Sequence, residues 1–290
     1  MQEEKIMAHK TILGNIFYFF CVLALTVFFA DSASAAEVKM TFYGNQHFRF
    51  VSTTGKVILI NPWIKGNKDA SISIDDYKRT GVDLILPTSG HGDDQGDASE
   101  IAAKTGATIF VLAELGSIMQ ADIKKFGGDP KQVYRAAISG RYKLGDITVQ
   151  MLHAVHGSGA KPPKGHPGPL YGGFGTGFLI TFENGLRVLM AGSTGLTMDL
   201  QLFGMRYKPH IAMLPIMGRY MMHPDDAAYA AKLLMTDNPN LKTVIPQHFR
   251  VKGAFPGMGT PEQFAAEVRK LGLPLKVLVP EVGKEVVLRK

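Results

Sequence analysis

The chain has 290 residues, of which 46% are hydrophobic and 20% charged, with one cysteine and a formal net charge of +7 at pH 7. The residues that follow the first 36 suffice for a full core, as one large domain or two small ones. The positive charge favours an anionic partner, such as a phosphorylated or carboxylated substrate or an anionic membrane surface, and the alternative is an ordinary solvated basic surface. Nucleic acid is not expected, because the basic residues are scattered and no binding motif accompanies them.

The first 36 residues have the order of a secretory signal peptide. Residues 16–30 form an apolar run, Lys10 precedes it, and Ala-Ser-Ala at 33–35 is a small-residue cleavage site. The run is shorter than the roughly 20 residues that a spanning helix needs. We therefore expect cleavage, a periplasmic or secreted location, and no membrane span afterwards. Cys21 would leave with this segment, so the domain at 37–290 would have no thiol.

Short runs of β-branched and aromatic residues open the mature chain, and strands then alternate with helices. The expected strands are residues 38–43, 48–52, 57–60, 82–86, 108–112, 142–144, 147–152, 178–182, 186–190, 211–216, 243–246 and 276–279. The expected helices are residues 98–104, 115–126, 198–203, 225–234 and 261–271. The Gly/Pro-rich stretch 157–177 is expected to be a loop and a candidate substrate lid, because it exceeds ordinary connection lengths. This order predicts two packed sheets flanked by helices.

The turn after the strand at 82–86 carries the densest set of ionisable side chains. His91, Asp93 and Asp94 lie within four residues, at a strand-to-helix turn where they can converge on one point. Such a cluster is a candidate cation site. The alternative is an ordinary helix N-terminus, whose free N–H groups would suit Asp93, Asp94 and Asp97.

Four other predicted strand ends carry polar or metal-ligating side chains. They are His153-Ala154-Val155-His156, Ala191-Gly192-Ser193-Thr194-Gly195, Ile216-Met217-Gly218-Arg219 and Ile245-Pro246-Gln247-His248. In α/β folds the ends of strands are where ligand sites are assembled. Residues far apart in the sequence are therefore expected to meet at one rim.

From about Val38 to Lys290 the order of these segments resembles the metallo-β-lactamase superfamily. It is most similar to the branch of small metal-dependent hydrolases that includes the ascorbate-phosphate lactonase. The resemblance rests on Tyr43-Gly44-Asn45, Leu59-Ile60-Asn61-Pro62, the turn from Ser89 to Asp94, His156, residues 191–196, Leu214-Pro215-Ile216 with residues 224–228, and Ile245-Pro246-Gln247-His248. It implies an α/β fold of four layers, an αββα sandwich.

Three positions depart from the family's metal-binding pattern. The signature turn of the family reads His-x-His-x-Asp-His, and here Ser89 and Asp94 replace its first and last histidines. Ser193 replaces the aspartate that bridges two metal ions in the family. A neutral serine is a poor ligand for a divalent ion, so one ion is expected rather than two.

The ligands that the resemblance implies for this ion are His91, Asp93, Asp94, His156 and His248. A mixed set of nitrogen and oxygen ligands suits zinc, manganese or iron. Asp93 or Asp94, if it does not bind the metal, would act as the catalytic base that takes the proton of the attacking water.

Other residues near these landmarks could complete the site. His47, His153 and His223 are alternative ligands, although each could equally be an ordinary surface or buried histidine. Arg219, Lys161 and Lys164 are predicted to bind an anionic group of the substrate. A cluster of methionines is expected to fill the core or to form an apolar substrate wall rather than to bind copper: Met213, Met217, Met221 and Met222.

The sequence thus predicts a metal-dependent hydrolase that cleaves an ester, lactone or phosphoester with a metal-activated water. The competing hypothesis is an exported, catalytically degenerate protein that binds a ligand on the same fold.

Overall fold

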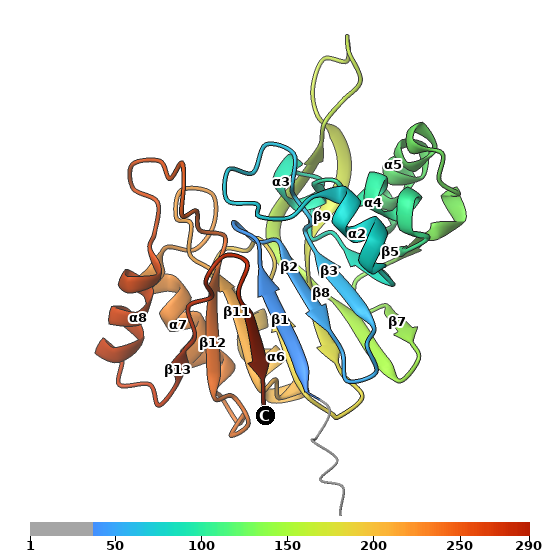
Figure 1. Cartoon of the computed structure of the whole chain (residues 1–290). Coiled ribbons are helices and arrows are strands. Elements are labelled where there is room, and N and C mark those ends of the chain that lie inside the picture. Colours follow the sequence, from blue (N-terminus) through green and yellow to red (C-terminus); the bar gives the residue numbers. More distant parts are fainter. Residues whose placement is uncertain (1–36) are drawn as a thin grey trace, which may run out of the picture. The chain divides into compact units, whose positions relative to one another are not determined.

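Two seven-stranded sheets organise residues 37–290, which are the residues that the computed structural model describes (Figure 1). The first sheet has the strand order β14-β1-β2-β3-β4-β5-β6, and the second has the order β13-β12-β11-β10-β9-β8-β7. The predicted signal peptide lies outside the described residues. Among the residues that are described, no helix is long and apolar enough to cross a membrane.

Every predicted strand and helix is present in the predicted order, and the structure adds two strands and two α-helices that were not predicted, β6, β14, α2 and α3. The strands of the first sheet are β1 Val38–Phe42, β2 Phe48–Val51, β3 Val57–Ile60, β4 Leu84–Leu86, β5 Thr108–Leu112, β6 Val133–Ala136 and β14 Glu285–Leu288. Those of the second sheet are β7 Arg141–Leu144, β8 Ile147–Ala160, β9 Leu170–Thr181, β10 Arg187–Met190, β11 Ile211–Pro215, β12 Thr243–Gln247 and β13 Lys276–Val277. The α-helices are α2 Ile74–Thr80, α3 Gly92–Gln95, α4 Ala98–Thr105, α5 Ala113–Ile123, α6 Asp199–Tyr207, α7 Pro224–Leu234 and α8 Pro261–Lys270.

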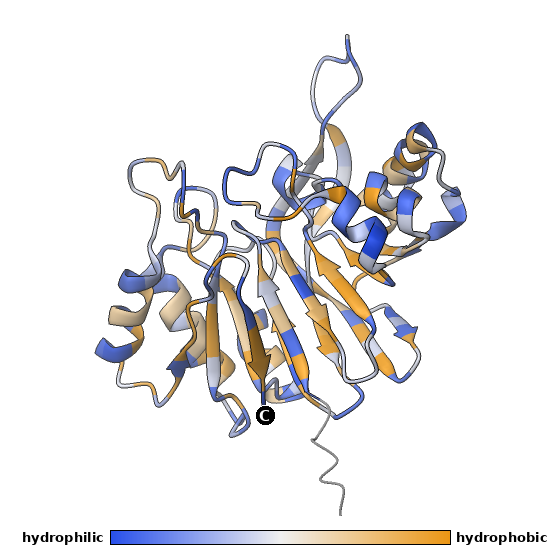
Figure 2. Cartoon of the chain, in the orientation of Figure 1, coloured by the Kyte–Doolittle hydropathy of each residue, from blue (hydrophilic) through white to orange (hydrophobic). Residues whose placement is uncertain are grey.

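Alternation along the strands of the first sheet creates its two buried faces. In β3, Ile58 and Ile60 belong to the core between the sheets, whereas Val57 and Leu59 pack toward the helices on the other side. Successive side chains of a strand point to opposite faces, so a strand that is buried on both sides reads as a continuous apolar run. Figure 2 shows hydrophobic residues concentrated along the strands. The predicted αββα sandwich is confirmed.

The hydrophobic core between the sheets forms one cluster with the residues that pack α7 and α8 against the second sheet. Phe178 of β9 and Val188 of β10 are fully buried, and they belong to the same cluster as Leu234 of α7 and Phe264 of α8. Strands β10, β11 and β12 are parallel neighbours, as are β3, β4 and β5. The carboxyl ends of parallel strands meet at one edge of a sheet, which is where the turns with ionisable residues lie.

The prediction of a long loop over residues 157–177 was wrong for most of that range. Strands β8 and β9 continue through it as an antiparallel arm, and only residues 161–169 connect them (Figure 1). The arm is held by its backbone ladder and by Ser158, whose hydroxyl donates to the Gly172 carbonyl. Many residues of this arm are glycines, so no alternation of polar and apolar side chains marks its strands in the sequence.

Gly192, directly after β10, offers a stability test of this packing. Its φ is +70°, and a Cβ there would lie 2.1 Å from the carbonyl oxygen of Thr176. The substitution Gly192→Ala adds both backbone strain and an overlap with backbone that must move. We expect it to lower the free energy of unfolding by about 3 kcal/mol or more, measured by urea denaturation.

Gly55→Ala is the matched control. Gly55 has a φ of +83° but nothing within 4 Å of its added Cβ, so only the backbone strain remains. Its expected cost is about 1 kcal/mol. Equal losses in the two variants would contradict the close approach at Gly192.

Candidate metal centre

The candidate site is assembled from the ends of β4 and β12 and from the interior of β8, so both sheets contribute to it. His91, Asp93 and Asp94 follow β4 and surround the start of α3, and His156 lies on β8. His248 follows β12 with a φ of +61°, and its backbone N–H donates to the Asn45 carbonyl at 2.7 Å. A left-handed conformation at a non-glycine residue is strained, and this one aims an imidazole at the site.

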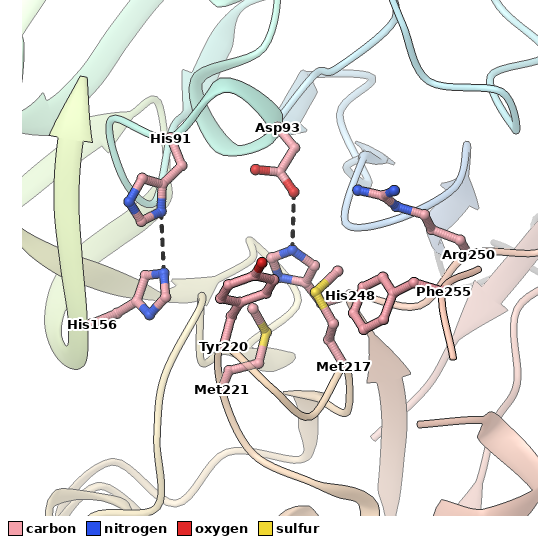
Figure 3. A pocket seen from close by; sticks show the side chains of 9 residues that line it. All are labelled: His91, Asp93, His156, Met217, Tyr220, Met221, His248, Arg250 and Phe255. Atoms are coloured by element: carbon pink, nitrogen blue, oxygen red, sulfur yellow. Dashed lines mark hydrogen bonds and ion pairs between the residues drawn. The ribbon is translucent and has the colours of Figure 1, made fainter. Parts of the chain in front are cut away.

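His91, His156 and Asp94 form the first group of metal-ligating side chains. The Nε2 of His156 lies 3.2 Å from the Nδ1 of His91, and that Nδ1 lies 4.0 Å from an Asp94 oxygen (Figure 3). Burial, followed by the neighbouring His91 and His248, lowers the pKa of His156 to about 4. The imidazole of His156 is therefore neutral at neutral pH, which is the form that binds a metal.

Asp93, Asp94 and His248 form the second group. The Nε2 of His248 lies 3.2 Å from an Asp93 oxygen, and the Asn45 side-chain amide donates to the same oxygen at 2.9 Å. Burial acts to raise the pKa of Asp93, but the hydrogen bonds from His248 and Asn45 outweigh it and hold the pKa below its ordinary value. Asp93 is therefore an ionised carboxylate at neutral pH.

Asp94 belongs to both groups and lies at their centre. Its carboxylate accepts a hydrogen bond from Ser89, and it accepts another from the Ser193 hydroxyl, whose oxygen lies 3.2 Å and 3.3 Å from the two carboxylate oxygens. The Ser193 oxygen also lies 3.3 Å from the Nδ1 of His248. Of the three positions that depart from the family's pattern, Ser89 and Ser193 thus both contact the third, Asp94.

The donor set fits a metal ion. The Asp94 side chain is only 1% exposed, and burial followed by the charge of Asp93 raises its pKa to about 6. A buried carboxylate is costly to ionise unless a cation accompanies it. Ring nitrogens and carboxylates converging on such a group supply both the charge and the ligand types that a divalent ion needs.

Asp97, the third acid of this turn, has a structural contact instead. It does not cap the N-terminus of α4 through its side chain, and it accepts backbone N–H groups of Ile64 and Lys65 at 2.8 Å and 2.9 Å. Asp93 and Asp94 lie in the first turn of α3, as the helix N-terminus alternative expects, and they also belong to the ligand groups, so the two interpretations coincide at this turn.

The three alternative histidines do not join either group within residues 37–290. His47 is fully buried, with its Nε2 2.7 Å from the Tyr77 hydroxyl. His153 pairs with Asp199 at 2.8 Å. His223 is an exposed residue that precedes α7, and its ring lies beside Gly218.

The three cations predicted to bind the substrate also lie elsewhere. Lys161 lines a separate cavity beside α5, and Lys164 is exposed in the connection between β8 and β9. Arg219 is exposed, with its guanidinium 5.1 Å from the ring centre of Tyr220. The sequence carries no signal that shows where the charged end of a long, flexible lysine or arginine side chain will lie.

A cavity of about 420 Å³ opens beside the ligand groups. Its lining is His91, Asp93, His156, Met217, Tyr220, Met221, His248, Arg250 and Phe255 (Figure 3). Met217 and Met221 form part of its apolar wall, one of the two alternatives predicted for the methionines. Arg250 and Phe255 were not predicted, and the only signal for Arg250 is its position two residues after His248.

Two sheets flanked by helices, with a histidine and carboxylate centre at the strand ends, define a metallo-β-lactamase fold. The family model for the β-lactamase superfamily domain matches residues 39–248. The chain therefore belongs to the β-lactamase superfamily, among its metal-dependent hydrolases.

Individual relatives agree with this assignment. The UPF0173 metal-dependent hydrolase of Thermodesulfovibrio yellowstonii is 33% identical over 274 residues, which cover 91% of this chain and 97% of that protein. A protein of the same description from Rubrobacter xylanophilus is 34% identical, with 85% of this chain and 95% of the relative covered.

A solved structure is similar over nearly the same range. Igni18, described as a novel metallo hydrolase of Ignicoccus hospitalis, has a TM-score of 0.69 and 32% identity, and the match covers 87% of this chain and 99% of that one. This chain is accordingly a metal-dependent hydrolase.

Proposed function

We propose that this hydrolase cleaves an ester, lactone or phosphoester of a small molecule at the cavity beside His91 and His248. The observation that carries the proposal is the convergence of two groups of metal-ligating side chains on one buried carboxylate, Asp94, beside a cavity that His91, Asp93, His156 and His248 line. An ester, lactone or phosphoester offers an oxygen that a cation polarises and a centre that water attacks.

The metal ligands would come from two groups that share Asp94, namely His91 with His156 and Asp93 with His248. Bound there, a divalent ion such as zinc, manganese or iron supplies a Lewis acid that lowers the pKa of water and polarises the scissile group. Asp94 is buried and does not line the cavity, so its position favours binding the ion over accepting a proton.

If it does not bind the ion, Asp93 is the better placed of the two acids to accept the proton of the attacking water. It lines the cavity and stays ionised, because His248 and Asn45 donate hydrogen bonds to it. His248 fixes the orientation of this carboxylate. The apolar side chains of Met217 and Met221 exclude bulk water from one side, which strengthens the electrostatic interactions within the cavity.

The sequence expectation of one ion is one of two arrangements that these residues allow. A single ion would use one group of ligands, whereas two ions would share Asp94. Export to the periplasm or the medium, expected from the N-terminal residues, completes the proposal.

The test combines metal content with turnover. The purified protein, loaded separately with zinc, manganese and ferrous iron, is assayed with 4-nitrophenyl acetate, dihydrocoumarin and bis(4-nitrophenyl) phosphate, and its metal is measured by mass spectrometry. We expect at least one equivalent of metal and hydrolysis of one of these substrates, with both reduced at least tenfold in His156→Ala.

His153→Ala is the matched control, because His153 lies on the same strand but pairs with Asp199 outside both groups. It should keep both metal and activity. Metal binding without hydrolysis of any of the three substrates would instead support the ligand-binding alternative, and full activity of His156→Ala would contradict the proposed site.

A further inference from the structure

Arg250 is the one cation in the lining of the cavity beside the metal centre. Figure 3 shows it on the far side of the Asp93 and His248 pair from His91 and His156. Among residues 37–290, no carboxylate lies within ion-pair distance of its guanidinium, and its Nε is buried without a hydrogen-bond partner. The buried Nε is out of reach of a ligand, so the N–H groups that a ligand in the cavity can satisfy are those of the two terminal nitrogens of the guanidinium.

The backbone on both sides of Arg250 is anchored, so this cation is presented in a defined place. Phe249 forms a β-bridge with Asn45. On the other side, the buried Asp69 carboxylate accepts the backbone N–H groups of Val251 and Lys252 at 2.8 Å and 2.7 Å.

The guanidinium is also oriented by an aromatic ring. Its carbon lies 5.4 Å from the centre of the Trp63 ring. Stacking of this kind holds the plane of a guanidinium while leaving the N–H groups at its edge free to donate. Those N–H groups match the spacing of the oxygens of a carboxylate or phosphate.

The remaining lining of the cavity is apolar and aromatic. Met217 and Met221 form one wall, and the rings of Tyr220 and Phe255 meet edge to face with their centres 6.4 Å apart. A ligand that fills this space presents an apolar body to these side chains. Its charged end would reach Arg250, while its scissile group would lie at the metal centre.

We propose that the cavity selects amphipathic anions, and that Arg250 binds a carboxylate or phosphate group distinct from the scissile bond. The substrate class is thus an ester, lactone or phosphoester with an apolar body and a separate anionic oxygen group. The claim that such an anion is a substrate rests on the proposed hydrolysis. The claim that Arg250 binds an anion does not rest on it, because binding can be measured without turnover.

The single tryptophan of the chain makes this binding directly observable. Trp63 stacks on Arg250, so an anion that binds the guanidinium should change its fluorescence. The probes are phenylacetate and phenylphosphonate, with 2-phenylethanol as the neutral compound of similar size. We expect Arg250→Met to raise the dissociation constants of both anions at least tenfold and to leave that of 2-phenylethanol within twofold, with Arg250→Lys in between.

Arg219→Met is the matched control, because Arg219 also stacks on an aromatic ring but does not line the cavity. It should bind all three probes as the unmodified protein does. Each titration is run with metal-loaded and with chelated protein. A preference for the anions that disappears on chelation and is unchanged in Arg250→Met would overturn the inference. A tenfold loss of anion affinity in Arg219→Met rather than in Arg250→Met would also overturn it.

Turnover separates this inference from the proposed hydrolysis. Hydrolysis of 4-nitrophenyl acetate together with anion binding that does not depend on Arg250 would refute the anion site alone. Anion binding that depends on Arg250 in a protein without hydrolytic activity would support the anion site and refute the proposed reaction.

Discussion

Replacement of Asp94 by asparagine is expected to remove metal binding without destabilising the metal-free protein. Asp94 is the only side chain common to both ligand groups of the described chain, so its loss weakens the two groups together. Activity is expected to fall at least about 100-fold. In the chelated protein the amide replaces a buried charge whose pKa is raised to about 6, so the free energy of unfolding at pH 7 should not fall. Metal analysis and urea denaturation measure the two effects.

Asp199→Asn is the control for this substitution, because Asp199 also pairs with a histidine but lies outside both groups. Adding Ser193→Asp to Asp94→Asn restores a carboxylate where the family has its bridging aspartate, and partial recovery of metal is expected. If the unmodified protein holds two equivalents of metal and Asp94→Asn loses both, Asp94 is shared by two ions. If the unmodified protein holds one equivalent, a single ion is bound. Retention of all metal by Asp94→Asn would refute its role.

The sequence identified each altered position of the metal centre but not the relation among them. Ser89 and Asp94 stand five residues apart, whereas Ser193 is 99 residues away from Asp94 in the chain. Their contact depends on how the ends of β4 and β10 approach each other across two packed sheets. In the sequence, the loss of the bridging aspartate suggested a site that had lost one of its metal ligands. In the structure, the Asp94 carboxylate lies among the remaining ligands and is common to both groups.

The fold was predictable where side-chain patterns report burial. Strands β3 and β5 have the predicted bounds, because a continuous apolar run is what burial on both faces of a sheet demands. The arm of β8 and β9 was missed because glycines carry no such pattern. Strand β14 was also missed, and it depends on pairing between Val38 and Leu288 at opposite ends of the domain.

In the sequence, only its position two residues after His248 distinguishes Arg250 from the other arginines. In the structure, what distinguishes it is its surroundings, since Asp69 anchors the following backbone from 182 residues away and Trp63 stacks on its guanidinium. Sequence proximity to a strand end favoured Arg219 instead. In the structure that residue is exposed and lies outside the cavity lining.

Acidification from pH 7 to pH 5 is expected to destabilise the protein through His47. Burial lowers the pKa of His47 from 6.5 to about 3, so in this range the imidazole binds a proton in the unfolded chain but not in the folded one. When the pKa of a histidine is lower in the folded protein than in the unfolded chain, the folded state has its full stability above the unfolded pKa of 6.5. That stability is lost as the pH falls toward the folded pKa of about 3. His47 alone should remove about 2 kcal/mol of unfolding free energy at pH 5. Urea denaturation of chelated protein at the two pH values, compared with His47→Gln, measures this contribution.

The comparison between the two proteins isolates His47 from other groups that titrate in the same range. Neutral His156 adds to the acid loss, while Asp94, whose pKa is raised, opposes it by binding a proton in the folded state near pH 6. Both contributions are common to the two proteins and cancel in the difference. Tyr77→Phe removes the hydroxyl beside His47 but keeps the burial, so it should retain the full acid loss. A flat response in Tyr77→Phe would mean that the hydrogen bond, rather than burial, keeps His47 neutral, and an unchanged acid loss in His47→Gln would exclude His47 as its source.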